Sequence, residues 1–353
     1  MAPIMREISQ SPDVRLQVVA TNMHLSDDYG HTVDEIMADG FNVDVRVESL
    51  VPGGTPGATV LSMAKVQEGL AKAFETLRPD LVVILGDRYE ALAAAAAAVV
   101  FNIPVAHLHG GETTEGAIDD RFRHAITKLS TYHFAATPQY VEKIISMGEN
   151  PSHVFHSGAP GASVSQDDYP SEYLYQPPFI LLAFHPVTTL SDKGEAELKA
   201  TIEALDSFIN QGYQILVTMP NSDPGTLRIS QMLLDWEKER NGMVRTVKSL
   251  GAKRFHQAME NAVAMVGNSS AALIEAPSHR LAAVNVGIRQ KGRAHGITVI
   301  DAPADKDKII MALGAILSFE MKAVLLGQPV SALNPYFKEN SSSFIAKKLI
   351  ELL

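Results

Sequence analysis

The sequence of 353 residues contains no cysteine. Disulfide bonds, thiolate catalysis and cysteine-ligated metal centres are therefore excluded. Long hydrophobic runs are also absent, because the most apolar stretch, residues 91–101, is far shorter than the roughly 20 residues of a transmembrane helix. Residues 1–10 contain Arg6 and Glu7 and no apolar stretch of the signal-peptide kind, so we expect a cytoplasmic protein that does not enter a membrane.

Positive charge is in deficit, with 30 Lys and Arg residues against 40 Asp and Glu residues and a formal net charge of -10. This balance argues against a protein that coats nucleic acid or anionic lipid, although it leaves room for a small cationic site. Hydrophobic residues make up 46% of the chain, which is typical of a globular protein with a sizeable core. At roughly 100–200 residues per domain, the length predicts two domains.

Short apolar segments, rich in β-branched residues, alternate with longer segments of helical spacing such as Ala64–Leu77 and Glu195–Ile209. The apolar segments have the length of strands buried on both faces of a parallel sheet, so the alternation predicts an α/β fold. These predicted strands are Leu16–Ala20, Leu81–Leu85, Ile103–Leu108, Ile180–Phe184, Ile215–Thr218, Val263–Val266 and Ala282–Val286.

A proline-rich stretch interrupts the alternation and predicts a linker at residues 161–178, between an N-terminal domain (residues 1–160) and a C-terminal domain (residues 179–353). The sequence leaves open which domain the last helix, about Ser342–Leu353, packs against. A helical segment, Pro3–Ile8, precedes the first strand, whereas parallel α/β domains usually open with a strand. We therefore expect either a domain that begins with a helix or a first strand that lies outside this chain.

Ligands of open α/β sheets bind at the carboxyl ends of the strands, so the polar residues that follow each strand are the candidate site. The first half supplies carboxylates, namely Asp87, Glu112, Asp119 and Asp120, which are candidates for proton transfer. Three of these carboxylates also have a structural interpretation. Asp87 can cap the next helix, and Asp119 and Asp120 can form the acidic first turn of a helix over residues 121–129.

The second half supplies residues suited to anions. Ser269 and Ser270 lie where a helix should begin, so their hydroxyls and the first free N–H groups can hold phosphate. Glu275, five residues after Ser270, can accept hydrogen bonds from ribose hydroxyls. The remaining candidates follow other strands or lie on a glycine-punctuated loop, and are His185, Asn221, Arg289 and Arg293. The arginines are also consistent with a solvated surface pair.

Several common motifs are missing. The chain has neither a GxGxxG fingerprint nor a GxxxxGK[ST] loop, and it has no GxSxG elbow. Dinucleotide redox chemistry, P-loop hydrolysis and serine hydrolysis therefore have no support. His107 and His109 form a His-x-His pair, but no carboxylate spacing typical of a metal site accompanies it. We expect no metal and no cofactor.

Motifs along nearly the whole chain resemble those of the hydrolysing UDP-N-acetylglucosamine 2-epimerases, above all the bacterial enzymes of sialic-acid-type sugar biosynthesis. The resemblance implies two Rossmann-like domains of the glycosyltransferase-B type with the active site in the cleft. The motifs are GDRYEALA (residues 86–93), GGE (110–112), IDD (118–120), RHAITK (123–128), HPVTT (185–189), PN (220–221), GNSS (267–270) and RQKGR (289–293).

The resemblance also implies a reaction. UDP leaves C1 while a base removes the C2 proton, and water then adds to the resulting 2-acetamidoglucal to release N-acetylmannosamine. By matching positions, the resemblance implies that Asp87, Glu112 and one of Asp119 or Asp120 are the acid/base carboxylates. It implies nucleotide or cleft contacts for His185, which would assist UDP departure, and for Arg88, Asn221, Ser269, Ser270, Glu275 and Arg289.

Some alternatives stay open. Relatives of this family act on a 2,4-diacetamido-trideoxy UDP-sugar on the way to legionaminic acid, and a glycosyltransferase or an inactive nucleotide-sugar-binding protein could share the architecture. The non-hydrolysing epimerases carry Glu-Ala-Gly-Leu-Arg where this chain has GETTE at residues 111–115. Family members also begin with a strand and a Gly-[Ser/Thr]-Arg loop ahead of the helix that starts here near Pro3. The expected partner is a UDP-sugar, and we expect a homo-oligomer.

Overall fold

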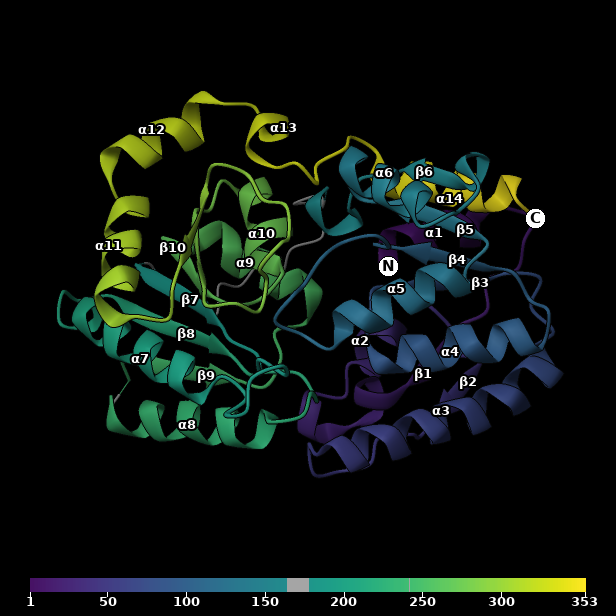
Figure 1. Cartoon of the computed structure of the whole chain (residues 1–353), viewed down its shortest axis with the longest axis horizontal. Helices are drawn as coiled ribbons and strands as arrows, with labels where there is room; N and C mark the ends of the chain where they lie inside the picture. Colours follow the sequence, from purple (N-terminus) through teal and green to yellow (C-terminus); the bar gives the residue numbers. More distant parts are fainter. Residues whose placement is uncertain (164–177, 241) are drawn as a thin grey trace. The chain divides into compact units, whose positions relative to one another are not determined.

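The structure, a computed structural model, describes residues 1–163, 178–240 and 242–353. The predicted linker therefore lies almost wholly outside the described residues. Contacts divide the chain into two compact units (Figure 1). Unit 1 comprises residues 1–112, 118–163 and 336–353, and unit 2 comprises residues 113–117 together with the described part of 164–335. The chain thus enters unit 2 briefly at residues 113–117 and returns to unit 1 for its last 18 residues, from 336 to 353.

Unit 2 is built on a six-stranded sheet in the order β12-β11-β10-β7-β8-β9. Every pairing in it is parallel. The order reverses between β7 and β10, and at such a switch point the loops that follow the two strands diverge and leave room for a ligand. The strands are β7 (Phe179–Ala183), β8 (Gln214–Thr218), β9 (Val244–Val247), β10 (Ala264–Gly267), β11 (Ala283–Val286) and β12 (Val299–Ala302).

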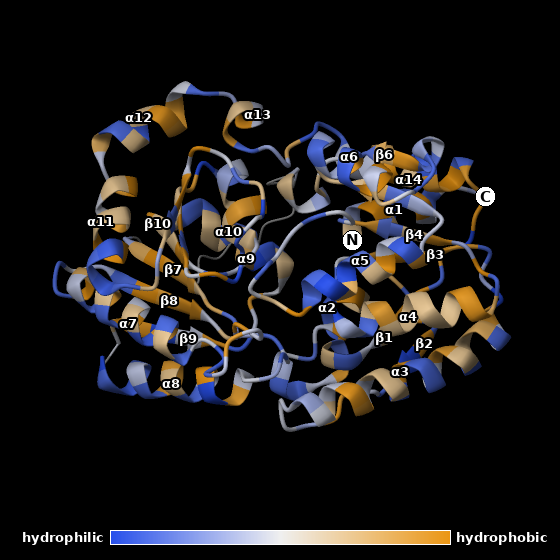
Figure 2. Ribbon diagram, in the orientation of Figure 1, coloured by the Kyte–Doolittle hydropathy of each residue, from blue (hydrophilic) through white to orange (hydrophobic). Residues whose placement is uncertain are grey.

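Helices cover both faces of this sheet because alternate side chains of each strand point to opposite faces. Ile180 and Leu182 of β7 pack with α7 (Glu195–Ile209), α8 (Thr226–Glu239) and α11 (Lys306–Ile316). Leu181 and Ala183 pack on the other face with α9 (Gly251–Asn261) and α10 (Ala271–Ile274). Figure 2 shows hydrophobic residues concentrated on β7 and β8. The predicted helix Glu195–Ile209 matches α7.

Unit 1 contains two parallel sheets among its described residues. The larger has the order β3-β4-β5-β6, and the smaller pairs β1 with β2. Their bounds are β1 (Val19–Thr21), β2 (Val45–Val47), β3 (Val82–Leu85), β4 (Val105–Leu108), β5 (Tyr132–Ala135) and β6 (Val154–His156). The expectation of a further strand ahead of residue 1 stays a prediction.

The helices of unit 1 also lie on two faces. One core joins α3 (Pro56–Leu77), α4 (Tyr89–Val100) and α5 (Asp119–Leu129) to Ile84 and Val105 of the sheet. The other core joins Ala106, Leu108 and Phe134 to α1 (Ala2–Gln10) and α14 (Ser341–Glu351). The last helix therefore packs in unit 1, beside the first. The other α-helices of unit 1 are α2 (Val33–Ala38) and α6 (Pro138–Ser146), and those of unit 2 are α12 (Phe319–Gly327) and α13 (Val330–Leu333).

Among the helices of the described residues, no single one combines the length and apolar character of a transmembrane span, and only α11 and α12 taken together do so, with a bend of 52° between them.

Candidate active site

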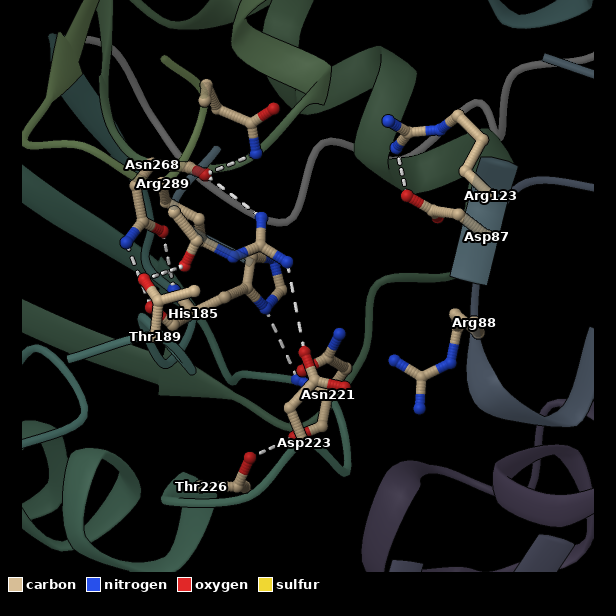
Figure 3. A network of polar contacts seen from close by, with 12 residues as sticks. Asp87, Arg88, Arg123, His185, Thr189, Asn221, Asp223, Thr226, Asn268 and Arg289 are labelled. Atoms are coloured by element: carbon tan, nitrogen blue, oxygen red, sulfur yellow. Dashed lines mark hydrogen bonds and ion pairs between the residues drawn. The ribbon is translucent and has the colours of Figure 1, made fainter. Parts of the chain in front are cut away.

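Asn268 joins the ends of the two strands at the switch point of unit 2. Its side-chain Oδ1 accepts a hydrogen bond of 2.7 Å from the backbone N–H of His185, and its Nδ2 donates to the His185 carbonyl at 2.9 Å (Figure 3). His185 follows β7 and Asn268 follows β10, so this two-point contact fixes the position of the histidine where a ligand is expected. Asn268 is fully buried. It belongs to the GNSS motif at residues 267–270, but the sequence alone did not predict a role for it.

The imidazole of His185 is oriented by the chain that follows β8. The backbone N–H of Asn221 donates to His185 Nδ1 at 3.4 Å. A neutral ring that accepts at Nδ1 carries its proton on Nε2, so His185 offers a hydrogen-bond donor from that nitrogen. The Asn221 carbonyl accepts a hydrogen bond from the Thr226 hydroxyl. Asn221 therefore acts here through its backbone, whereas the resemblance implied only that it lines the cleft.

Arg289 is buried, with 9% of its surface exposed, and is not half of a solvated surface pair. Its Nη1 donates to the Asn268 carbonyl at 3.1 Å, and its Nη2 lies 3.8 Å from Asp223 Oδ2 (Figure 3). Gln290 Nε2 donates to the same carbonyl at 2.9 Å, and Arg293 Nη1 donates to Gln290 Oε1 at 2.8 Å. The predicted arginines thus converge on the end of β10, with Asp223 as a partner that the sequence did not reveal.

Glu197 of α7 supports the start of the arginine loop. Its Oε1 accepts a hydrogen bond from the Ile288 N–H at 3.3 Å, and burial raises the pKa of this carboxyl group. Gly287 has a φ of 74°, and a Cβ atom there would lie 2.2 Å from Glu197 Oε2. A glycine is therefore required for the carboxylate to rest against the turn.

The serines and Glu275 lie around a helix that is shorter than expected. α10 has four residues, and Ser270 makes no side-chain capping bond. Ser269 Oγ accepts a hydrogen bond from Ala271 N–H at 3.3 Å. Because so short a helix has a weak dipole, the candidate anion-binding groups here are hydroxyl, imidazole and guanidinium groups. Glu275 follows the helix instead of lying on it, with Oε2 3.9 Å from His256 Nε2.

Residues 113–117 are attached to the arginine loop within unit 2. The Glu115 N–H donates to the Lys291 carbonyl at 3.1 Å, and the two side chains form an ion pair of 2.9 Å. The Thr189 hydroxyl donates to the Gly116 carbonyl at 2.9 Å. This segment is the direct covalent link between Glu112 and Asp119, so two candidate carboxylates flank a piece of chain held by unit 2.

Asp87 of unit 1 pairs with Arg123, a buried arginine of α5 (Figure 3). Asp120 Oδ1 lies 3.7 Å from Arg123 Nη1, and Asp120 Oδ2 lies 3.7 Å from His124 Nε2. Asp119 begins α5 and is 7% exposed. Asp87, Asp120 and Arg123 are thereby brought together where β3 ends and α5 begins. The role of Arg123 was missed, although its spacing of three residues from Asp120 on a helix was the available signal.

Glu112 is fully buried and hydrogen-bonded to His109, with 2.6 Å between Oε1 and Nδ1. His109 is a residue whose pairing the sequence did not reveal. The preceding histidine, His107, is fully buried, with Nε2 2.8 Å from the Gly86 carbonyl, and burial lowers its pKa to about 4. The two histidines therefore have separate roles, and no group of three or more His, Asp or Glu side chains in the described residues could hold a metal ion.

Arg88 lies next to the Asp87 cluster but pairs elsewhere. Its Nε donates to Glu90 Oε1 at 2.7 Å, and its guanidinium lies over the Tyr89 ring. Within unit 1, candidate proton-accepting groups lie at the ends of β3 and β4, and within unit 2, hydrogen-bond donors suited to an anion lie at the ends of β7 and β10.

Comparisons with known proteins identify the family of this chain. The sequence profile of UDP-N-acetylglucosamine 2-epimerase matches residues 6–350. A protein of Legionella pneumophila named UDP-N,N'-diacetylbacillosamine 2-epimerase (hydrolyzing) is 37% identical over 331 residues, which are 90% of this chain and 85% of that protein. A UDP-N-acetylglucosamine 2-epimerase of Neisseria meningitidis is 31% identical, over 89% of this chain and 82% of that one.

Solved structures support the fold. The UDP-GlcNAc 2-epimerase of Methanocaldococcus jannaschii, crystallised with UDP-GlcNAc and UDP, superposes with a TM-score of 0.80 at 17% identity, covering 99% of this chain and 95% of that one. At this identity the similarity concerns the fold, and it confirms the predicted α/β class with parallel-sheet units. The sequence matches confirm the predicted resemblance and the predicted enzyme class, and they establish that this chain belongs to the UDP-N-acetylglucosamine 2-epimerase family.

Proposed function

We propose that this protein is a hydrolysing UDP-sugar 2-epimerase, which converts a UDP-2-acetamido sugar and water into UDP and the free sugar epimerised at C2. The observation that carries the proposal is the arrangement of His185, Asn268 and Arg289 at the ends of β7 and β10. It offers neutral and cationic donors, which are suited to a diphosphate, at the switch point of a parallel sheet.

The nucleotide half of the site is assigned to unit 2. His185 donates from Nε2 to the diphosphate and stabilises its negative charge as UDP leaves C1. Arg289 and Arg293 supply positive charge, and Ser269 and Ser270 supply hydroxyl donors to phosphate oxygens. Glu275 accepts hydrogen bonds from the ribose hydroxyls, and Asn221 orients His185 through its backbone N–H.

Proton transfer is assigned to unit 1. The candidate acid/base groups are Asp87, Glu112 and one of Asp119 or Asp120, with Arg88 beside them. Removal of the C2 proton and loss of UDP create a C1=C2 double bond. Return of a proton to the opposite face of C2, with hydroxide from water added at C1, gives the epimerised sugar. We assign both proton transfers at C2 to these side chains of unit 1.

For the sugar itself, we propose the 2,4-diacetamido-trideoxy substrate, UDP-N,N'-diacetylbacillosamine, ahead of UDP-N-acetylglucosamine. The support is the name of the Legionella pneumophila relative at 37% identity, together with a Campylobacter jejuni relative at 32% identity named GDP/UDP-N,N'-diacetylbacillosamine 2-epimerase (hydrolyzing). A role in sialic-acid-type biosynthesis has the weaker support of a 32% relative named polysialic acid biosynthesis protein P7. A homo-oligomer and a cytoplasmic location stay predictions.

The test supplies each UDP-sugar separately, measures UDP release by a coupled assay and identifies the free sugar by NMR. We expect UDP release with both, and a higher kcat/KM for the diacetamido sugar. Preference for UDP-N-acetylglucosamine would overturn the substrate assignment alone, and absence of UDP release with either sugar would overturn the proposed function.

A further inference from the structure

His109 and Glu112 form a hydrogen-bonded pair in which the histidine is the more accessible member. Nδ1 lies 2.6 Å from Glu112 Oε1, and the side chains are 13% and 0% exposed, respectively. The carboxylate, when ionised, can only accept, so Nδ1 carries the hydrogen of this bond. The lone pair of a neutral ring is then on Nε2, for which the described residues provide no hydrogen-bond partner.

The backbone at His109 is held in an unusual conformation. Its φ is 66°, in the left-handed region that residues other than glycine rarely adopt. The backbone N–H of His109 donates to the Phe134 carbonyl at 3.1 Å, so the strand β5 fixes the residue from one side while Glu112 fixes its ring from the other. Strained backbone of this kind is concentrated at functional sites.

The neighbouring carboxylates are committed to another partner. Asp87 and Asp120 both face the buried guanidinium of Arg123, and Asp120 also faces His124. The positive charge of Arg123 therefore offsets part of their negative charge within the protein. The imidazole of His109 differs from them because it is backed by a buried carboxylate that stabilises the protonated ring, as in the histidine–carboxylate pairs that perform general-base catalysis.

We propose that His109 is the base of the elimination step and that Glu112 is a positioning residue that acts through it. The proposal rests on the proposed function and changes the role of Glu112 within it. The C2 proton passes to His109 Nε2, the C2–H electron pair becomes the C1=C2 bond, and the C1–O electron pair leaves with UDP. Glu112 stabilises the imidazolium formed, which later gives its proton to water.

The first test uses His109→Gly, because glycine tolerates the positive φ and leaves space for a free imidazole. We expect UDP release to fall by about two or more orders of magnitude, with unchanged UDP affinity, and to recover partly when imidazole is added. Asn102→Gly is the matched control, since Asn102 is exposed and also has a positive φ, of 57°. It should keep full activity and show no response to imidazole.

The second test uses Glu112→Gln and the pH profile of kcat/KM. Glutamine can still accept the hydrogen bond from Nδ1 but lacks the negative charge that stabilises the imidazolium. We expect lower turnover, and an acid limb that shifts to lower pH by about one unit or more. A purely structural role for Glu112 would lower turnover without moving the limb.

The outcomes separate the proposals. If the wild type releases UDP and His109→Gly retains its rate to within about tenfold, or is not rescued by imidazole, His109 is not the base and the inference fails alone. Loss of activity in Glu112→Gln with an unshifted limb would overturn the role assigned to Glu112, because the carboxylate would then not stabilise the imidazolium of the base. If the wild type releases no UDP, the proposed function fails and the inference fails with it.

Discussion

Arg123 is 1% exposed, yet its guanidinium is matched by the carboxylates of Asp87 and Asp120. A buried charge is tolerated only when it is paired, and removal of one partner leaves the others uncompensated. The pairing holds two candidate catalytic carboxylates in place at the ends of two separate elements. The residue that organises them was absent from the predicted site, because a sequence does not reveal which arginine of a helix faces inward.

Replacement of this arginine should therefore destabilise the protein. We expect Arg123→Met to lower the free energy of unfolding by about 2–4 kcal/mol, since Asp87 and Asp120 lose their counter-charge but keep some access to water. Arg121→Met, an exposed position on the same helix, should stay within about 0.5 kcal/mol of the wild type. Urea denaturation measures both. Equal stability of the two variants would show that the buried ion pair contributes nothing.

Glu275 gives a prediction for the nucleotide side. We expect Glu275→Ala to weaken UDP binding by about 1–3 kcal/mol, the size of a charge-assisted hydrogen bond lost. Glu203→Ala, at a solvent-exposed position of α7, is the control and should bind UDP normally. Calorimetry checks both, with magnesium or EDTA expected to make no difference. An unchanged affinity in Glu275→Ala would move the ribose contact to another residue.

Three histidines, His107 and His256, which are buried, and His279, which is half-buried, predict how stability depends on pH. Burial lowers the pKa of His107, His256 and His279 to about 4 each, against an unfolded value near 6.5. The unfolded chain therefore binds protons that the folded chain does not, and stability should fall as the pH decreases from about 6.5 to about 4. Each histidine contributes up to about 1.4 kcal/mol per pH unit. His295, whose pKa is raised by its bond to Asp301, acts in the opposite direction.

His107→Gln isolates one of these contributions. Denaturation curves at several pH values between about 4.5 and 7.5 give the slope of the unfolding free energy against pH. Near pH 5 we expect this slope to be smaller in the variant by about 1.4 kcal/mol per pH unit, which corresponds to about one proton fewer taken up on unfolding. A slope identical to that of the wild type would mean that His107 is protonated in the folded state at this pH.

At the scale of elements, the segment 113–117 is the feature that depends most on close packing. A Cβ atom on Gly116 would lie 2.4 Å from Arg289 Cα and 2.5 Å from the Ile288 carbonyl oxygen, both of them backbone atoms. Backbone cannot move aside as a flexible side chain can. The segment and the arginine loop therefore require a glycine at this position.

Gly116→Ala should separate the two pieces of chain and misplace both Arg289 and the flanking carboxylates. We expect turnover to fall by about tenfold or more, because displacements near 1 Å are costly in active sites. Gly314→Ala is the control, since no atom lies within 4 Å of its added methyl group and alanine favours the helix α11. Steady-state rates decide, and a Gly116→Ala enzyme as fast as the wild type would mean that the segment does not position the site.

The strands that the sequence predicted are those with continuous apolar runs. All seven have counterparts, because strands with both faces buried need such runs. Five strands were missed. Four of them, β2, β6, β9 and β12, lie at sheet edges, where polar residues such as Arg46 and Asp301 alternate with apolar ones. The fifth, β5, lies inside its sheet but is only four residues long and begins with Tyr132 and His133, so it has no continuous aliphatic run. The candidate residues were found at strand ends, but their partners Arg123, Asn268 and Asp223 depend on tertiary packing that spacing does not encode.

At the scale of the whole molecule, both units use the same principle. The six-stranded sheet of unit 2 and the four-stranded sheet of unit 1 are both parallel and covered by helices on both faces, and polar residues lie at the carboxyl ends of their strands. The proposed function divides the chemistry between them, with proton transfer proposed for unit 1 and nucleotide binding for unit 2. Family membership is established by the sequence, whereas the order of bond making and breaking is the part that most needs a direct experiment.

The central claim, elimination followed by hydration, is tested most directly by running the reaction in deuterated water. The protein is incubated with UDP-N,N'-diacetylbacillosamine, and in parallel with UDP-N-acetylglucosamine, while NMR follows UDP release and the C2 position of the free sugar. Because the C2 proton is removed and a solvent proton is returned, the account predicts UDP and a C2-epimerised sugar that carries deuterium at C2. A product that retains its original hydrogen at C2 would contradict the account.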